Sequence, residues 1–244
     1  MIRGIGIDGW SRLGEIPSLR HLSGRALRAM TERACVCGLC DGDILVHQGD
    51  ILRSIYFVES GGIRLISYSA DGQAVALKIY GPGDVFGLLA TSDPYPHPAQ
   101  IEAIHDTVVI GIEGQEVRRL IAQFPEIALT IIDLFAAHVH EGHERVQHMA
   151  TKRVDRRLAQ CLLKFADKFG IQQDHCLELD VPLSQRDLAE FANTTVETIN
   201  RTLAAWEKQG ILTCSHKHID ILDQPALESI AEAETYDPII PQRS

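Results

Sequence analysis

Residues 182–211 read PLSQRDLAEFANTTVETINRTLAAWEKQGI, and their pattern predicts the fold of the C-terminal part. Ser184 and Asp187 have the spacing of a capping box, which predicts a short helix that begins after Ser184. The polar residues 193–194 interrupt this helix, and Thr195 can cap a second one. Two short helices joined by a tight polar turn form a helix-turn-helix.

The second of these helices is amphipathic. Its apolar residues recur with helical spacing and form a stripe that we expect to be buried: Val196, Ile199, Leu203 and Trp206. Glu197, Asn200 and Arg201 are exposed near its N-terminal end, where a recognition helix presents side chains to base edges. Arginine can bond guanine, and glutamate can accept a hydrogen bond from cytosine. The alternative is a solvated helix face with an ordinary Glu197–Arg201 pair.

The residues on either side of this motif predict a winged domain that starts with a helix at residues 154–169. Residues 177–181 and 219–222 resemble short strands, and the latter predicts a β-hairpin wing after the second helix. The tail after Asp223 is acidic and contains three prolines, and we expect its last ten residues to be loosely ordered.

The N-terminal half has the texture of a β-roll. Short β-rich runs at 44–46, 55–58, 63–66, 74–77 and 107–110 are separated by Gly-Asp turns, which suggests a compact antiparallel barrel or roll. Gly61-Gly62 and Asp71-Gly72 are candidate hairpin turns. Ser23 can cap a short helix over 23–33.

A helix of about 24 residues follows at 126–149, with the apolar stripe Ile127, Ile131, Leu134, Phe135, Val139, Val146 and Met149. A helix this long beside a small β domain often pairs with a second copy of itself. The alternative is that it packs on its own domain.

These readings predict an α+β protein of five parts. They are an N-terminal arm with a short helix (1–33), an antiparallel β-roll sensor domain like a cyclic-nucleotide-binding jelly roll (34–124), a long dimerisation helix (125–150), a winged helix-turn-helix (151–223) and an acidic tail (224–244).

The order of these parts resembles the CRP/FNR transcriptional regulators. The resemblance covers about residues 40–222 and rests on GDILVHQGDILRSIYFVESGGIRL, on GPGDVFG, on the long helix and on TTVETINRTL. It implies a homodimer that binds a pseudo-palindromic double-stranded DNA site and contacts RNA polymerase. VETINR and HPAQIEA look closer to the FNR-like branch, which implies Glu197 and Arg201 as the principal base-reading residues. The DNA-binding set that we predict is Ser184, Gln185, Thr195, Val196, Glu197, Asn200 and Arg201.

The distribution of charged residues along the chain is consistent with a separate DNA-binding part. The net charge is −10, which by itself speaks against nonspecific coating of nucleic acid. Residues 152–222, however, carry 10 basic and 10 acidic side chains, and their opening is locally basic. The chain has no run of about 18 apolar residues and no signal-peptide pattern, so we expect no membrane association and a cytoplasmic location.

Three of the six cysteines, Cys35, Cys37 and Cys40, fall within six residues. Disulfides are rare in the cytoplasm, and three thiolates in a short loop can converge on one metal ion or one edge of an Fe–S cluster. The sequence therefore predicts an Fe–S cluster or another thiolate-bound metal, with the fourth ligand unassigned. Two alternatives stay open, a thiol redox switch and ordinary strand residues. Oxygen-sensing relatives place their cysteines in an earlier arm and at the position of Ile110, so their cluster is not carried over.

The sequence also bears on a cyclic nucleotide and on haem as the sensed ligand. The cyclic-nucleotide branch carries an Arg-Ser pair where this chain has residues 96–99, PHPA, so cAMP is not expected. His138, His140, His143 and His148 on the long helix make an axial haem ligand thinkable, against a solvent-facing set. The roll histidines His47, His97 and His105 have no carboxylate at a supporting spacing, so no enzyme is expected. A DNA-binding regulator without any sensor is the remaining alternative.

Overall fold

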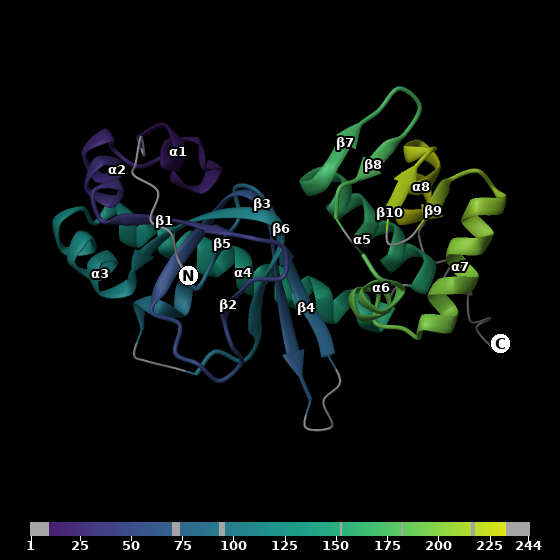
Figure 1. Ribbon diagram of the computed structural model, residues 1–244, viewed down its shortest axis with the longest axis horizontal. Coiled ribbons are helices and arrows are strands. Elements are labelled where there is room, and N and C mark those ends of the chain that lie inside the picture. The colour runs from purple at the N-terminus through teal and green to yellow at the C-terminus, as the bar shows by residue number, and fades with distance from the viewer. Residues whose placement is uncertain are drawn as a thin grey trace, which may run out of the picture. The chain divides into compact units, whose positions relative to one another are not determined.

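The computed structural model describes residues 10–69, 74–92, 96–151, 153–181, 183–215 and 218–232 (Figure 1). The chain divides into two compact units, Met1–His143 and Glu144–Ser244, and each is described by itself. The predicted α+β class, with a β-roll, a long helix and a C-terminal winged helix-turn-helix, is confirmed. Within the described ranges, no helix has the length and apolar character that crossing a bilayer requires.

The first unit is built on one antiparallel sheet. Its main path runs β1-β6-β3-β4, with β2 paired to β6 and β5 paired to β3. The strands are β1 (Ala34–Leu39), β2 (Ile44–Val46), β3 (Ser54–Tyr68), β4 (Ala74–Tyr80), β5 (Val85–Phe86) and β6 (Gln100–Glu113). Side chains alternate along each strand. Cys37 and Leu39 therefore join one core inside the roll, and Ala34 and Val36 join a second core under the helices.

The predicted hairpin turn at Gly61-Gly62 is wrong, because both glycines lie inside β3. Gly61 has φ +72 and lies where the pairing of β3 with β6 is irregular. On either side of it, Ser60 of β3 pairs with Val108 of β6, and Gly62 of β3 pairs with Ile104. The hydroxyl of Thr107 accepts from the Gly62 amide at 3.0 Å and donates to the Gly62 carbonyl. The bulge thus bends one long strand instead of ending it. The other candidate turn, Asp71-Gly72, lies outside the described residues.

Helices cover one side of this sheet. They are α1 (Trp10–Glu15), η1 (Pro17–Leu19), α2 (Gly24–Thr31), η2 (Leu88–Thr91), α3 (Gly114–Gln123) and the part of the long α4 (Glu126–Thr151) that belongs to this unit, up to His143. Ser23 caps α2 as predicted, accepting from the Ala26 amide at 3.3 Å. Its hydroxyl also donates to Glu126 at 2.8 Å, which ties the start of α2 to the start of α4.

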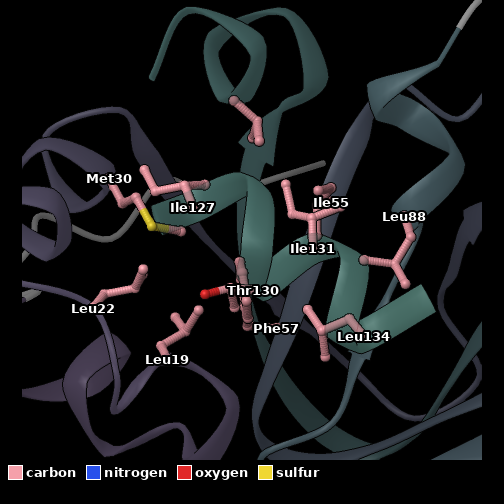
Figure 2. Close-up of a pocket in the computed structure, with 11 residues that line it drawn as sticks. Leu19, Leu22, Met30, Ile55, Phe57, Leu88, Ile127, Thr130, Ile131 and Leu134 are labelled. Carbon is pink, nitrogen blue, oxygen red and sulfur yellow. The ribbon is translucent and has the colours of Figure 1, made fainter. Parts of the chain in front are cut away.

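Figure 2 shows the centre of this second core. Leu19, Leu22 and Met30 of the N-terminal segment face Ile127, Thr130, Ile131 and Leu134 of α4, with Ile55 and Phe57 of β3 nearby. These side chains leave a cavity of only about 20 Å³ with an apolar lining. A space of this size holds at most about one water molecule and offers it no partner. The core therefore has no room for a small-molecule effector.

The long helix α4 has two apolar faces, and the predicted stripe divides between them. Ile127 is buried, and Ile131, Leu134 and Phe135 pack against the second core of their own unit. Val139 of the stripe instead lies 54% exposed on an open face, together with Leu129 at 64% and Ile132 at 59%. The first four residues of the predicted stripe thus belong to the fold of the protomer, while the side chains of Val146 and Met149 lie outside the description.

The described part of the second unit combines the four helices α5 to α8 with a small sheet ordered β7-β8-β10-β9. Its elements are α5 (Val154–Phe169), β7 (Gly170–Gln172), β8 (Leu177–Leu179), α6 (Gln185–Phe191), α7 (Val196–Lys208), β9 (Leu212–Ser215), β10 (His218–Ile221) and α8 (Gln224–Glu232). The hairpin β9–β10 confirms the predicted wing.

The first nine residues of the predicted acidic tail, 224–232, are helical. They form α8, which packs against α5 and buries Leu227 completely. Arg156 and Gln160 of α5 both donate to the Ala231 carbonyl, at 2.8 and 2.9 Å. The last helix is therefore part of the folded unit.

Candidate nucleic-acid interface and sensor residues

Helix α6 begins with the capping box that the sequence predicts. The Ser184 hydroxyl accepts from the Asp187 amide at 3.1 Å, and the Asp187 carboxylate accepts from the Ser184 amide at 3.0 Å. This reciprocal pair satisfies two amides at the helix start and fixes its first turn. Leu188 and Ala189 then anchor the helix in the core, while Gln185 stays exposed.

Helix α7 also begins with a side-chain cap and buries one face. Thr195 accepts from the Thr198 amide at 3.2 Å and so caps the helix. Three of the four residues of the predicted stripe, Ile199, Leu203 and Trp206, are buried. Val196 is the exception, since 39% of it is exposed. The helix therefore presents one fixed face to the core and leaves its N-terminal turn at the surface.

That surface carries the predicted base-reading residues. Glu197, Asn200 and Arg201 are exposed, together with Thr195 and Val196. In this described helix, no ion pair forms between Glu197 and Arg201, although they stand four residues apart. The carboxylate and the guanidinium are thus both directed to solvent, as side chains that bind base edges must be.

A cleft of about 280 Å³ lies beside α6 and the wing. It has both apolar and polar lining residues: Leu183, Ser184, Gln185, Leu188, Leu203, Cys214, Ser215, His218 and Ile219. Burial, with the carboxylates of Glu207 and Asp220, raises the pKa of the Cys214 thiol to about 11. The sequence gives no role to Cys214, Ser215 or His218, because no local pattern predicts that the wing folds back beside α6.

The predicted three-cysteine loop is wrong. Cys35 and Cys37 lie in strand β1, opposite Gly111 and Val109 of β6, and Cys40 follows the end of that strand. An extended chain rises about 3.3 Å per residue, so Cys35 and Cys40 stand roughly 16 Å apart. The sulfur ligands of one metal ion lie about 4 Å apart, and two cysteine side chains are too short to close a backbone separation of this size. The three thiols therefore do not fit a single metal ion or cluster edge.

The surroundings of the thiols differ as well. Cys35 and Cys40 are exposed, whereas Cys37 is buried in the roll core. Burial raises the pKa of the Cys37 thiol, and the neighbouring Cys35 adds to the shift. Across the parts of the chain that are described, no three His, Cys, Asp or Glu side chains gather as metal ligands would. This includes His138, His140 and His143, while the side chain of His148 lies outside the description.

A cluster of charged and aromatic groups joins the roll to α4. Lys78 of β4 pairs with Glu141 of α4, and its ammonium lies 4.8 Å from the centroid of the Tyr80 ring. Burial lowers the pKa of His138, and Lys78 lowers it further while Glu141 opposes the shift. Burial and the carboxylates of Glu141 and Asp84 raise the pKa of Tyr80.

The segment that carries Arg-Ser in the cyclic-nucleotide branch has no cation here. His97 lies within 2.6 Å of the Ala99 carbonyl through Nδ1, and Ala99 is fully buried. On strand β3, Arg64 pairs in register with Glu102 of β6 and forms an ion pair with it at 2.7 Å. Its positive charge is therefore already matched by a carboxylate of the protein.

Comparison with known proteins agrees with the two units. Residues 38–124 match the model of a cyclic nucleotide-binding domain. Residues 156–230 match that of a Crp-like helix-turn-helix domain.

Individual relatives are of two kinds. A CRP-like cAMP-activated global transcriptional regulator of Mycobacterium tuberculosis is 26% identical over 202 residues, covering 83% of this chain and 90% of the relative. The transcriptional activator protein FnrA of Stutzerimonas stutzeri is 23% identical and covers 78% of each chain. The structure of FixK2 from Bradyrhizobium japonicum superposes with a TM-score of 0.70 at 23% identity, over 83% of this chain and 99% of that one. At this identity the last likeness concerns the fold.

Proposed function

The chain belongs to the CRP/FNR family of transcriptional regulators, and on that premise we propose that it is a homodimeric, sequence-specific DNA-binding regulator. Regulators of this family bind DNA and act as dimers. The chain would act in the cytoplasm on a pseudo-palindromic site in double-stranded DNA, with RNA polymerase as a protein partner. A role in binding and regulation, not an enzymatic reaction, is what both matched domains favour.

The observation that carries this proposal is the exposed N-terminal turn of α7. Glu197 and Arg201 supply an acceptor and a bidentate donor for base edges, Asn200 supplies both, and Val196 offers an apolar contact for a thymine methyl. Thr195, Ser184 and Gln185 stand at the starts of the two helices, where they can approach the phosphate backbone. The VETINR sequence of this turn supports recognition in the manner of the FNR-like branch.

The test is a binding experiment with a selected duplex. The full-length protein selects a duplex from a randomised pool, and its affinity is compared with that for an unselected duplex of equal length. Arg201→Ala should cost about 1–3 kcal/mol on the selected duplex only. Lys208→Ala removes the same charge from the other end of α7 and should leave the preference intact. Equal losses on both duplexes would reduce Arg201 to a phosphate contact, and failure to select any duplex would overturn the proposal.

Dimer formation is supported by the open face of α4. Leu129, Ile132, Ala136 and Val139 are exposed at spacings of three, four and three residues, as in the seam of a coiled coil. Exposed apolar side chains in such a row are costly in a monomer. A second copy of α4 covers them with matching side chains.

We propose that the signal received by the roll is not cAMP, although some relatives are cAMP-activated. Support comes from the absence of Arg and Lys at residues 96–99 and from the Arg64–Glu102 pair, in which a carboxylate of the protein already matches the guanidinium. Addition of cAMP should leave the affinity for the selected duplex unchanged, with AMP as the control. A cAMP-dependent gain in affinity would contradict this part of the proposal.

For the signal itself we propose thiol redox chemistry in place of a cluster. The exposed thiol of Cys35 is accessible to a hydroperoxide, which would oxidise it to sulfenic acid and be reduced to water or an alcohol. The anaerobically purified protein should then lack the broad absorption near about 400 nm of an Fe–S cluster and the sharp band of haem. Peroxide should change duplex affinity in the wild type and not in Cys35→Ser. No peroxide effect on the wild type would favour the regulator without a sensor.

A further inference from the structure

Arg157, in the first turn of α5, reaches the turn between the two helices of the helix-turn-helix. Its Nε donates to the Ala192 carbonyl at 2.7 Å, and its Nη2 donates to the Asn193 carbonyl at 3.1 Å. Two consecutive carbonyls of one turn are therefore held by a single planar guanidinium. A lysine ammonium has no such fork, so this arrangement requires arginine.

The turn needs this support because its backbone is unusual. Asn193 has φ +47, a left-handed conformation that few residues other than glycine adopt. The amides of Ala192 and Thr194 bond back to α6, to the Leu188 carbonyl at 2.9 Å and the Ala189 carbonyl at 2.8 Å. The carbonyls of Ala192 and Asn193 accept the hydrogen bonds from Arg157. Helix α7 starts with Val196, three residues after Asn193, so the turn sets where the recognition helix begins.

We propose that Arg157 is a positioning residue for DNA recognition: it clamps the α6–α7 turn to α5 and so fixes the angle at which the start of α7 meets the major groove. This inference rests on the proposed function and deepens it. In the sequence, Arg157 belongs to a locally basic segment that suggests attraction of DNA phosphates. In the structure, its donors are directed at the protein's own backbone.

The chain contains a matched control on the same helix. Arg156, the preceding residue, donates through Nε to the Ala231 carbonyl of α8, which also receives Gln160. Removal of Arg156 changes the charge of the unit as much as removal of Arg157 does. Of the bonds described for these two arginines, those of Arg157 go to the carbonyls of the α6–α7 turn and that of Arg156 goes to α8, so the two variants separate positioning from charge.

The first measurement needs no DNA. Hydrogen exchange of the Thr194 amide is compared in the full-length wild type, Arg157→Lys, Arg157→Ala and Arg156→Ala. Both Arg157 variants should exchange at this turn about tenfold faster or more, because the turn opens without the clamp. Arg156→Ala should match the wild type there. Thermal unfolding reports whether each variant folds, and Arg157→Lys keeps the test decisive if Arg157→Ala does not.

The second measurement uses the duplex that the wild type selects and a random duplex of equal length. Arg157→Lys should raise the Kd for the selected duplex about tenfold or more and leave the random duplex and the salt dependence unchanged. The proposal would be overturned if Arg157→Ala weakened binding to both duplexes equally and made the salt dependence shallower, while Arg157→Lys restored both. That result would identify Arg157 as a phosphate contact.

Wild-type behaviour of Arg157→Lys in both measurements would also overturn it. If no duplex can be selected, the proposed function fails, while the exchange experiment still decides whether the clamp exists.

Discussion

Lys78 of β4 forms an ion pair with Glu141 of α4 and thereby joins the roll to the long helix. The Lys78 side chain is only 18% exposed and lies over the ring of Tyr80, whereas Glu141 is 39% exposed. A half-covered pair of this kind is sensitive to its surroundings, since little water screens it. The same two charges act on His138 of α4 in opposite directions. His138 is therefore a built-in reporter of the contact between roll and helix.

Loss of Lys78 should raise the pKa of His138. In Lys78→Met the cation that opposes protonation is gone, while burial and Glu141 remain. Glu141→Gln should lower the pKa further, for the opposite reason. NMR titration of the His138 ring checks both shifts, and Arg119→Met on α3 is the control for loss of a distant positive charge. An unchanged titration in Lys78→Met would mean that the pair does not form in solution.

The lowered pKa of His138 makes stability depend on pH. The unfolded chain titrates near the ordinary value of 6.5 and the folded chain below it, so the unfolded state binds more protons between these two values. Stability is therefore full above the ordinary value and falls as the pH drops through this window. Urea midpoints of the wild type and His138→Gln, measured at about pH 7.5 and about pH 5.5, should show the smaller loss in the variant. Identical losses would assign the pH dependence to other groups.

Ile132→Glu should dissociate the dimer. The new carboxylate would lie in the exposed apolar face of α4, where a partner helix would bury it without a counter-charge. Light scattering at micromolar concentration measures the mass. Ala137→Glu places the same charge on an exposed position around the helix from that face and should remain dimeric. A dimeric Ile132→Glu protein would exclude this face as the interface.

Gly61→Ala should destabilise the roll strongly. A methyl group at Gly61 would lie 2.6 Å from the Asp106 carbonyl and 2.8 Å from the Thr107 Cα, in addition to requiring a positive φ. We expect a loss of roughly 3 kcal/mol in the free energy of unfolding. Gly42→Ala, with φ +78 and open space around it, should lose about 1 kcal/mol. Urea unfolding of both variants separates the steric cost from the backbone cost, and equal losses would contradict the close contact.

The thiols should react with iodoacetamide in a definite order. Cys35 and Cys40 are exposed and should be labelled first, whereas Cys37 is buried. Cys214, with a pKa near 11, should be slow at about pH 8 and accelerate as the pH rises. Peptide mass spectrometry after timed quenching gives the order. Early labelling of Cys37 would place it outside the roll core.

The parts of the fold that the sequence predicts correctly depend on near neighbours. The capping box of Ser184 and Asp187, the caps at Thr195 and Ser23, and the buried stripe of α7 all involve residues within a few positions of each other. These patterns do not depend on distant segments, because the hydrogen bonds or contacts are made within one helix. The recognition face follows directly, since it is the side of α7 that the stripe leaves exposed.

The errors concern contacts between distant segments. Cys35 and Cys37 belong to a strand only because residues 107–112 of β6 pair with it, about 70 residues further on. Val196 looks like part of the buried stripe, and nothing in α7 alone says that its first turn stays at the surface. Likewise, α4 carries two apolar faces, and only the packing of α2 and β3 decides which of them the protomer buries.

The bonds from Arg156 and Gln160 to Ala231 bring the first and last helices of the second unit together. A module whose first and last helices, here α5 and α8, lie together can be joined end to end and reopened elsewhere without disrupting its core. Circular permutation with a new opening in the β7–β8 hairpin should therefore be tolerated, whereas a cut before Gln224 removes the helix that buries Leu227. For engineering, the natural module extends through residue 232 and does not stop at the wing.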